Sequence, residues 1–168
     1  MPKSLVPDFV FNTFADITVD FLRERSIRAL LCDVDNTLSP YEHAVPNESV
    51  CAWIKAMHEG GIKIALVSNN NYDRINKYNA GLGLVAYADA GKPSRKCYRK
   101  AANDLCIDIK DCAVLGDQLL TDCWSARRLG IPCFIVPPIN DKRDLFHRMK
   151  RAIEKPFMHI YHNRMNKK

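Results

Sequence analysis

Two aspartates, Asp33 and Asp35, follow directly after the apolar run 29–32. Such a run predicts a buried strand, which places both carboxylates at the carboxyl end of that strand. Two carboxylates at a buried strand tip are costly, because like charges repel and burial disfavours the charged form. The pair is understandable if it serves a divalent cation and a reaction, so it predicts a catalytic site.

Further polar residues stand at or shortly after the ends of later strand-like runs. In chain order these residues are Ser68, Asn69, Lys92, Asp117 and Asp122. In an open parallel α/β sheet the carboxyl ends of the strands form one edge, and ligands bind at that edge. We therefore expect these residues to meet Asp33 and Asp35 at a single site.

The residue types fit phosphoryl transfer, which needs an in-line nucleophile, neutralised phosphoryl oxygens and an acid for the leaving oxygen. Asp33 can be the nucleophile and form an acyl-phosphate. Asp35 can protonate the leaving alcohol and then activate water. Ser68 can hydrogen-bond a phosphoryl oxygen beside the N–H groups of a helix N-terminus. Lys92 can neutralise both the phosphoryl group and the nucleophilic carboxylate.

Hard oxygen ligands in this set also fit Mg²⁺, which Asp33, a backbone carbonyl and Asp117 can hold together with several waters. Each candidate has an ordinary explanation when it is taken alone. A Ser-Asn-Asn run caps helices, a lysine is usually solvated, and an aspartate often occupies a turn. Their occurrence in one order, each at a strand end, favours the functional interpretation.

Apolar runs and helical patterns alternate along most of the chain. Strands are predicted near 28–34, 62–67, 84–88, 112–116 and 132–136, and helices near 47–59, 71–80, 93–106 and 119–129. Repeated β–α units with almost continuous apolar strands predict an α/β fold, a single Rossmann-like three-layer domain around a parallel five-stranded sheet. Pro93 is expected in the first turn of the third helix.

Three segments are expected: an N-terminal arm with a short helix (1–27), a catalytic domain (28–137), and a basic C-terminal helix and tail (138–168). The basic helix is predicted over about 141–154, with Pro156 ending it. Residues 142–168 carry nine Lys/Arg and two acids, a net charge of +7, whereas the rest of the chain has a net charge of −1.

Two interpretations of this basic segment stay open. It packs on the domain and exposes a solvated face, or it contacts an anionic surface, either lipid or nucleic acid. Both accommodate an apolar stripe at near-helical spacing, formed by Leu145, Phe146, Met149, Ile153 and Phe157.

Some protein classes are disfavoured by the sequence. No apolar run approaches the roughly 20 residues of a membrane span, and the N-terminus lacks the apolar core of a secretory signal. Seven cysteines without a C-x-x-C pair favour buried, reduced thiols over disulfides or zinc. We therefore expect a cytoplasmic protein, attached peripherally to the inner face of the membrane if its substrate is a lipid.

The site residues resemble those of the haloacid dehalogenase (HAD) superfamily of phosphatases, over about residues 28–137. Asp33-Val-Asp35-Asn-Thr37 is similar to the D-x-D-x-T signature, and the later motifs are matched by Ser68, Lys92 and Gly116-Asp117…Asp122. The resemblance implies a Rossmann-like sheet of strand order 5-4-1-2-3, an aspartyl-phosphate intermediate and Mg²⁺ as cofactor. An aspartate at position 35, where the ATPases of the superfamily carry threonine, favours hydrolysis of a phosphoester.

The resemblance also assigns roles to individual residues. The expected phosphate-binding residues are Thr37, Ser68, Asn69 and Lys92. The expected metal ligands are Asp33, the backbone carbonyl of Asp35, and Asp117. The spacing before Asp122 is one residue longer than the commonest form in the superfamily, which favours an indirect role for Asp122 at the metal.

The intervals between the motifs are too short for an inserted cap domain. Only 30 residues separate Thr37 from Ser68, and only 23 separate Ser68 from Lys92. The superfamily inserts its caps in these two intervals, so the chain resembles the capless class III, subfamily IIIA. An open site suits a bulky substrate that itself covers the metal, because a small metabolite would be poorly shielded from water.

Four short stretches of the sequence are similar to the bacterial YqeG branch of this superfamily. They are Asp-Asn-Thr-Leu, Ser-Asn-Asn-Asn, Gly-Lys-Pro and Gly-Asp-Gln-Leu-Leu-Thr-Asp. That branch is similar to mitochondrial and plastid phosphatidylglycerophosphate phosphatases. The implied partner is a phospholipid phosphomonoester at an anionic membrane surface, in phospholipid biosynthesis. Two alternatives stay open: a capless phosphatase for another large substrate, such as a phosphoprotein or a nucleic-acid end, and a non-catalytic scaffold that docks on RNA.

Overall fold

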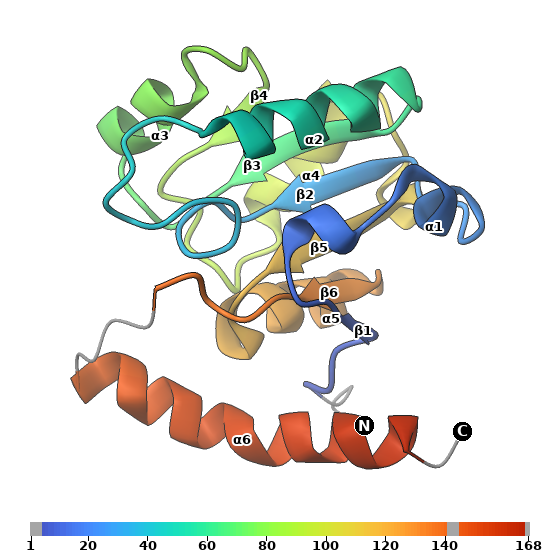
Figure 1. The fold of residues 1–168 in the computed structure, drawn as a ribbon, viewed down its shortest axis with the longest axis vertical. Coiled ribbons are helices and arrows are strands. Elements are labelled where there is room, and N and C mark those ends of the chain that lie inside the picture. Colours follow the sequence, from blue (N-terminus) through green and yellow to red (C-terminus); the bar gives the residue numbers. More distant parts are fainter. Residues whose placement is uncertain (1–4, 141–144, 167–168) are drawn as a thin grey trace.

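The computed structural model describes residues 5–140 and 145–166 of the 168-residue chain. One sheet of six parallel strands runs through the molecule in the order β1-β6-β5-β2-β3-β4 (Figure 1). The strands are β1 (Phe9–Val10), β2 (Ala29–Cys32), β3 (Lys63–Val67), β4 (Val85–Tyr87), β5 (Cys112–Gly116) and β6 (Cys133–Ile135). The five predicted strands and their order are confirmed, and β1 of the N-terminal arm adds a sixth strand beside β6.

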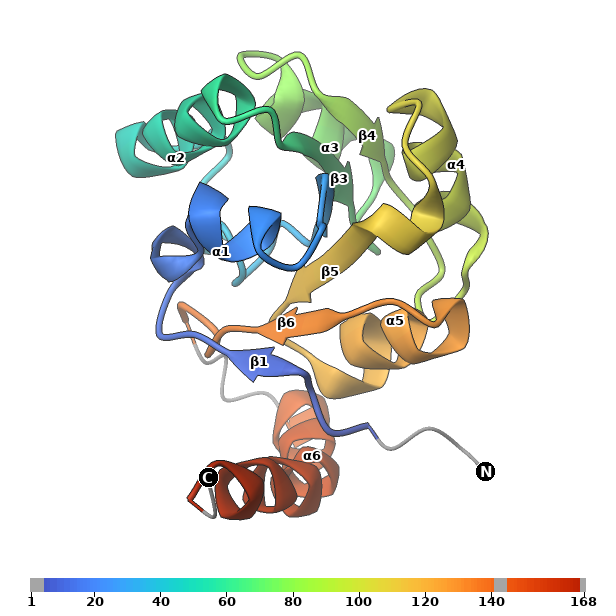
Figure 2. The ribbon, with the colours of Figure 1, turned by 90° about the vertical axis from the view of Figure 1, so that its right-hand side faces the viewer.

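Helices cover both faces of the sheet, as Figures 1 and 2 show. They are α1 (Val19–Arg23), α2 (Glu48–Glu59), α3 (Tyr72–Asn79), α4 (Lys96–Asp104), α5 (Trp124–Leu129) and α6 (Leu145–Met165). Helices α1, α2 and α3 contribute to one apolar core, whereas α4 and α5 contribute to the core on the other face. Side chains alternate along each strand, so Leu30 joins the first core and Leu31 joins the second. The predicted three-layer α/β fold is confirmed.

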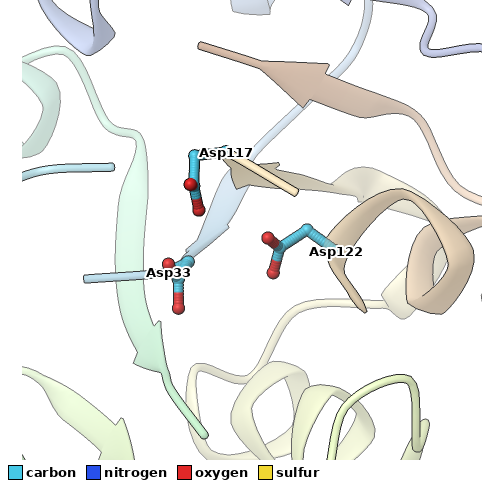
Figure 3. A group of neighbouring side chains, drawn as sticks. All are labelled: Asp33, Asp117 and Asp122. Carbon is cyan, nitrogen blue, oxygen red and sulfur yellow. The ribbon is translucent and has the colours of Figure 1, made fainter. Parts of the chain in front are cut away.

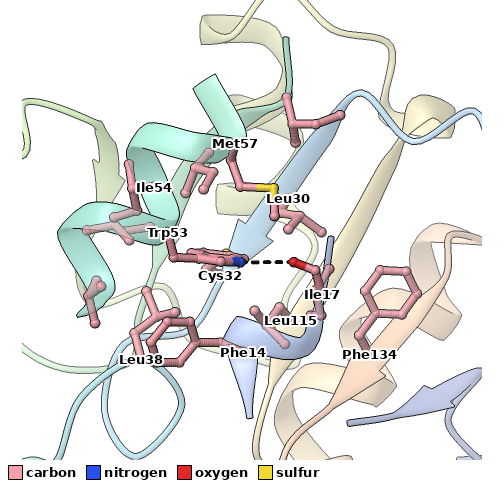
Figure 4. Packing of buried hydrophobic residues seen from close by; sticks show 14 of the residues in the cluster. Phe14, Ile17, Leu30, Cys32, Leu38, Trp53, Ile54, Met57, Leu115 and Phe134 are labelled. Carbon is pink, nitrogen blue, oxygen red and sulfur yellow. Dashed lines mark hydrogen bonds between the residues drawn. The ribbon is translucent and has the colours of Figure 1, made fainter. Parts of the chain in front are cut away.

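The larger core forms where α2 packs on the strands (Figure 4). Buried residues recur every three or four positions along this helix, as an amphipathic helix requires: Val50, Trp53, Ile54 and Met57. The indole N–H of Trp53 donates to the backbone carbonyl of Ile17 at 3.0 Å. This bond satisfies the polar atom of a buried aromatic side chain and ties the N-terminal arm to α2.

The helix boundaries follow from local sequence signals at most positions. Asn47 caps α2 by accepting from the Val50 N–H, and Asn71 caps α3 by accepting from the Arg74 N–H. The predicted start of the third helix at Pro93 is wrong, because α4 begins only at Lys96. Pro93 lies instead in a turn that the Ser94 N–H closes on the Gly91 carbonyl at 2.9 Å.

The C-terminal helix is longer than predicted, since α6 runs over Leu145–Met165 with Pro156 inside it. The prediction that Pro156 ends the helix is therefore wrong. A proline inside a helix removes one backbone hydrogen bond, but Pro156 is exposed, so water can bond the freed carbonyl. Buried side chains on both sides of Pro156, Glu154 and Tyr161, hold the two halves of the helix against the domain.

Helix α6 contacts the domain through one face. Glu154 and Tyr161 are buried, and Phe157 and Met158 pack against the second core. The Tyr161 hydroxyl accepts a hydrogen bond from the Val10 N–H of β1 at 3.1 Å. Of the predicted apolar stripe, Phe157 packs on the domain, whereas Ile153 is 52% exposed.

Parts of the predicted basic segment lie outside the described residues. These are residues 141–144 and 167–168, and the side chains of Leu145, Phe146 and Met149 are likewise not described. Among the described residues, no helix combines the length and the apolar character needed to cross a membrane. All seven cysteines are free, and Cys32, Cys112 and Cys133 are buried as predicted.

Candidate active site

Three buried carboxylates converge at the carboxyl edge of the sheet (Figure 3). Asp33 follows β2, Asp117 follows β5, and Asp122 lies in the turn after β5. One carboxylate oxygen from each residue lies within 4.8 Å of the others. Because β2 and β5 are adjacent parallel strands, their ends bring Asp33 and Asp117 together. This cluster, Asp33–Asp117–Asp122, is a candidate centre for a divalent metal ion.

The loop after β2 holds the Asp33 carboxylate with a neighbouring hydroxyl. Thr37 donates to Asp33 Oδ2 at 3.1 Å and lies 3.5 Å from Asp117 Oδ1. The predicted phosphate-binding residue Thr37 therefore also links two members of the aspartate cluster. In the loop between Asp33 and Thr37, Asn36 adopts a left-handed conformation with φ of 64°, which asparagine tolerates better than most residues.

Asp122 lies in a π-helical turn, η3 (Leu119–Cys123). The Gln118 carbonyl accepts from the Asp122 N–H at 2.9 Å and from the Cys123 N–H, five residues after Gln118, at 3.4 Å. A Cβ on Gly116 would overlap the Asp122 carboxylate, so only glycine lets this side chain approach. The long spacing is thus compatible with a place for Asp122 beside Asp33 and Asp117.

Lys92 lies buried between two of the carboxylates. Its Nζ is 2.6 Å from Asp33 Oδ1 and 2.8 Å from Asp122 Oδ1. Burial alone would lower the pKa of Lys92, but the charges of Asp122 and Asp33 outweigh burial and hold this pKa well above its ordinary value. Lys92 is therefore cationic at neutral pH and can neutralise charge on a bound phosphoryl group.

Burial has the opposite consequence for the nucleophile candidate. Burial raises the pKa of Asp33 from 3.8 to about 6, against the lowering effect of Lys92, while the nearby Asp122 raises it further. A divalent cation bound at the cluster would favour the ionised form of Asp33. Positive charge near Asp33 thus favours the ionised form that a nucleophile needs.

Asn69 holds the backbone that carries Lys92. Its Oδ1 accepts from the Lys92 N–H at 2.7 Å, and its Nδ2 donates to the Lys92 carbonyl at 3.4 Å. The predicted phosphate-binding residue Asn69 thus contacts the lysine loop. Ser68 is buried next to it, and its hydroxyl accepts from the Asn70 N–H at 3.0 Å.

Two residues that the sequence analysis did not assign to the site hold Asp35. Arg74 Nη2 pairs with Asp35 Oδ1 at 2.9 Å, and Asn70 Nδ2 donates to Asp35 Oδ2 at 3.0 Å. We call Asp35, Asn70 and Arg74 the polar flank. The available signal for Arg74 was its position one turn into the helix that follows Ser68, where its side chain can face the same sheet edge.

The opposite side of the centre is apolar. A cavity of about 320 Å³ opens between the ends of β1 and β6 and helix α6, and Asp117 lines it. A second cavity, of about 330 Å³, adjoins Thr37 and shares the walls Asn12, Val136, Pro137 and Pro138 with the first. We call the following lining residues the apolar flank: Phe11, Leu119, Val136, Pro137, Pro138 and Met158.

The donor set fits a small hard cation. All three candidate ligands are buried carboxylates, and hard oxygen atoms of this kind are the ligands that Mg²⁺ prefers. Soft ligands are absent from this cluster, so its chemistry favours Mg²⁺ or a similar ion over zinc. The backbone next to Asp35 lies at the same strand end and can add a carbonyl ligand.

Fold and site together define a class: an α/β protein with a Rossmann-like parallel sheet and a cluster of aspartates at the carboxyl ends of its central strands. The family model of haloacid dehalogenase-like hydrolases matches residues 15–130. The chain belongs to this family, and it is a phosphatase of the HAD type.

The chain is similar to known proteins both in sequence and in fold. It is 34% identical, over 156 residues, to the probable phosphatase YqeG of Bacillus subtilis (strain 168), which covers 92% of this chain and 90% of that protein. The fold is similar to that of CbbY from Rhodobacter sphaeroides in complex with phosphate (TM-score 0.56, 15% identity, 71% and 90% of the two chains). It is also similar to an uncharacterized protein from Listeria monocytogenes serotype 4b (TM-score 0.53, 18% identity, 70% and 85%).

Proposed function

We propose that this phosphatase is a Mg²⁺-dependent phosphomonoester hydrolase that works through an aspartyl-phosphate on Asp33. The observation that carries the proposal is the buried aspartate cluster with the Lys92 ammonium set between Asp33 and Asp122. Such a site concentrates a nucleophile and positive charge at the place where a phosphoryl group develops negative charge.

The roles divide among the residues as follows. One Asp33 oxygen attacks phosphorus, while Asp35 gives a proton to the leaving alcohol oxygen and later takes one from the attacking water. Asn70 and Arg74 fix the orientation of the Asp35 carboxyl group during both steps. Ser68 and Lys92 bind phosphoryl oxygens. Mg²⁺, held by Asp33, Asp117, the Asp35 carbonyl and Asp122, would supply further charge neutralisation.

We further propose that the substrate is a phospholipid whose head group ends in a phosphomonoester, with phosphatidylglycerophosphate as the leading candidate. The interval between Thr37 and Ser68 contains α2 and β3, and the interval between Ser68 and Lys92 contains α3 and β4, so neither holds an inserted domain. The apolar flank supports the lipid assignment, because it offers apolar walls directly beside Asp117 and Thr37. Such walls can contact the glycerol and upper acyl region of a lipid.

The outward face of α6 supports a location at an anionic membrane surface. Ile153 and Ile160 are exposed there one heptad apart, at 52% and 40%. Lys155 and Arg164 are exposed on the same helix. Apolar residues flanked by basic ones suit the boundary of an anionic bilayer, where each Lys or Arg contributes roughly 1 kcal/mol.

A single substrate comparison tests the function. Phosphate release is measured with Mg²⁺ on phosphatidylglycerophosphate in phosphatidylglycerol vesicles, on a water-soluble glycerol phosphomonoester, on a phosphopeptide and on a 5′-phosphorylated oligonucleotide. We expect the highest kcat/KM on the lipid and no release by Asp33→Asn on any substrate. A higher kcat/KM on the phosphopeptide or the oligonucleotide would overturn the lipid assignment, and metal-independent release would overturn the mechanism.

The membrane contact is tested without disturbing the packing of α6. The double variant Ile153→Ser, Ile160→Ser changes only outward-facing side chains. It should lose vesicle binding and lipid turnover while it keeps its turnover of the soluble phosphomonoester. Undiminished vesicle binding by this variant at low salt would show that α6 does not contact the membrane.

A further inference from the structure

Helix α6 reaches the catalytic edge of the sheet through one buried carboxylate. Glu154 is 4% exposed, and its Oε1 accepts from the Leu119 N–H at 2.9 Å and from the Leu120 N–H at 3.4 Å. A buried carboxylate is costly unless hydrogen bonds stabilise its charge. Two backbone donors from a segment 35 residues earlier in the chain provide such bonds.

The two donors belong to the first turn of η3, the π-helical turn that carries Asp122. The N–H groups at the start of a helix have no partners within the helix, and a carboxylate there also meets the positive end of the helix dipole. Asp122 Oδ2 accepts from the Gln118 N–H at 3.2 Å. Two carboxylates thus accept from three successive N–H groups at the start of the turn, Asp122 from that of Gln118 and Glu154 from those of Leu119 and Leu120.

The conformation of this turn decides where Asp122 lies. The Gln118 carbonyl accepts from the Asp122 N–H at 2.9 Å and from the Cys123 N–H at 3.4 Å, so the turn that starts at Gln118 is wider than a regular α-helical turn. Such π-helical turns are rare and are frequent at functional sites. Glu154 bonds the turn at two successive N–H groups, so it supports the turn where the widening begins.

We propose that Glu154 is a positioning residue for the metal centre: by bonding the Leu119 and Leu120 N–H groups it holds Asp122 beside Asp33 and Asp117. The affinity of the site for Mg²⁺ therefore depends on this contact between α6 and η3. This inference rests on the proposed metal dependence of the phosphatase. Residues that orient metal ligands typically change metal affinity by about 10–100-fold when they are removed.

A second contact on the same helix face provides a matched control. The Tyr161 hydroxyl bonds the Val10 N–H of the edge strand β1, so this hydrogen bond anchors α6 at β1 and Glu154 anchors it at η3. If Glu154 acted only as an anchor, removing either contact would lower the melting temperature and leave Mg²⁺ binding unchanged. If Glu154 positions Asp122, only the Glu154 variants change Mg²⁺ binding.

The experiment measures the Mg²⁺ dissociation constant of the full chain by titration calorimetry, at a temperature where every variant is folded. We expect Glu154→Leu to weaken binding by about 10-fold or more. Glu154→Gln keeps a carbonyl acceptor and should stay within about threefold of the wild type. Glu154→Asp keeps the charge but is one methylene shorter, so it should fold and still weaken binding by several-fold. Tyr161→Phe should lower the melting temperature and leave the dissociation constant unchanged.

The outcomes separate this inference from the proposed function. Wild-type Mg²⁺ affinity in both Glu154→Leu and Glu154→Asp would overturn the positioning role while leaving the phosphatase mechanism intact. If Glu154→Leu does not fold, Glu154→Asp alone decides, by the same criterion. Equal weakening by Tyr161→Phe would show that the docking of the helix matters and Glu154 itself does not. A wild-type chain that binds no Mg²⁺ would overturn both proposals at once.

Discussion

The polar flank and the apolar flank of the catalytic centre differ in how the chain assembles them. The polar flank joins Asp35 to Asn70 and Arg74, all within two consecutive β–α units, and ion pairing holds it. The apolar flank joins Phe11 to Met158, near the two ends of the chain, and packing holds it. The polar flank is therefore assembled from neighbouring parts of the sequence, whereas the apolar flank is built from parts of the chain that are far apart.

The largest expected effect comes from the centre that both flanks serve. Asp33→Asn removes the nucleophile, so kcat should fall by at least about 10³-fold on every substrate, with a folded protein shown by circular dichroism. Residual turnover close to that of the wild type would mean that neither flank surrounds the reacting carboxylate.

The next effect tests how tightly the aspartate cluster is packed. Gly116→Ala places a methyl group where the Asp122 carboxylate lies, so Mg²⁺ affinity should fall by about 100-fold. Gly81→Ala is the matched control, because an added Cβ there meets no atom within 4 Å. Unchanged Mg²⁺ affinity in Gly116→Ala would show that Asp122 can leave its observed position without loss of the ion.

A smaller effect is expected on the polar flank. Arg74→Met removes the ion pair that orients Asp35, so kcat should fall by about 10-fold with little change in KM, part of what general acid–base catalysis contributes. Lys77→Met, on an exposed position of the same helix, should have no effect. The kcat effect should be the same on soluble and lipid substrates, and a loss confined to the lipid would place Arg74 in substrate binding instead.

The apolar flank should show the reverse pattern. Met158→Gln replaces one apolar side chain of this flank by a polar one, so KM for the phospholipid should rise. The expected rise is about fourfold, which corresponds to the free energy of burying roughly one methylene group. The soluble phosphomonoester serves as the control, and its kinetic constants should not change. Equal changes on both substrates would mean that the flank shapes the centre and does not contact the lipid.

The smallest expected effect concerns the stability of the metal-free protein. Because burial raises the pKa of Asp33 to about 6 from 3.8, the folded protein binds more protons than the unfolded chain between these two values. The free energy of unfolding should therefore fall as pH rises through this window, which lowers the melting temperature by a few degrees. Melting curves in EDTA should show this slope in the wild type and lose it in Asp33→Asn, and a wild-type melting temperature that rises with pH would contradict the assignment.

The sequence predicts the parts of the site that depend on strand ends alone. Asp33, Ser68 and Asp117 each follow an apolar run, and parallel strands bring such positions to one edge. The order of the five main strands came from the family resemblance and is confirmed, whereas the two-residue strand β1 has too short a pattern to be recognised. Local alternation of strand and helix thus accounts for the core of the fold.

The remaining features depend on contacts that sequence spacing does not encode. The π-helical turn that carries Asp122 could not be predicted, because nothing in residues 117–122 indicates it. Glu154 is one of only two acids in a basic segment, and its partners lie 34 and 35 residues away. A proline such as Pro156 predicts the end of a helix, but tertiary contacts on both sides of it outweigh the cost of the one backbone hydrogen bond that it removes.

The bond between Glu154 and the Leu119 N–H also sets an order of events during translation. A ribosome delivers all six strands before it delivers α6, and N-terminal parts of a chain can fold while the rest is still being made. The nascent sheet can therefore form while the turn around Asp122 still lacks its outer support. Competence to bind the metal is then expected only after α6 has left the ribosome and docked on η3.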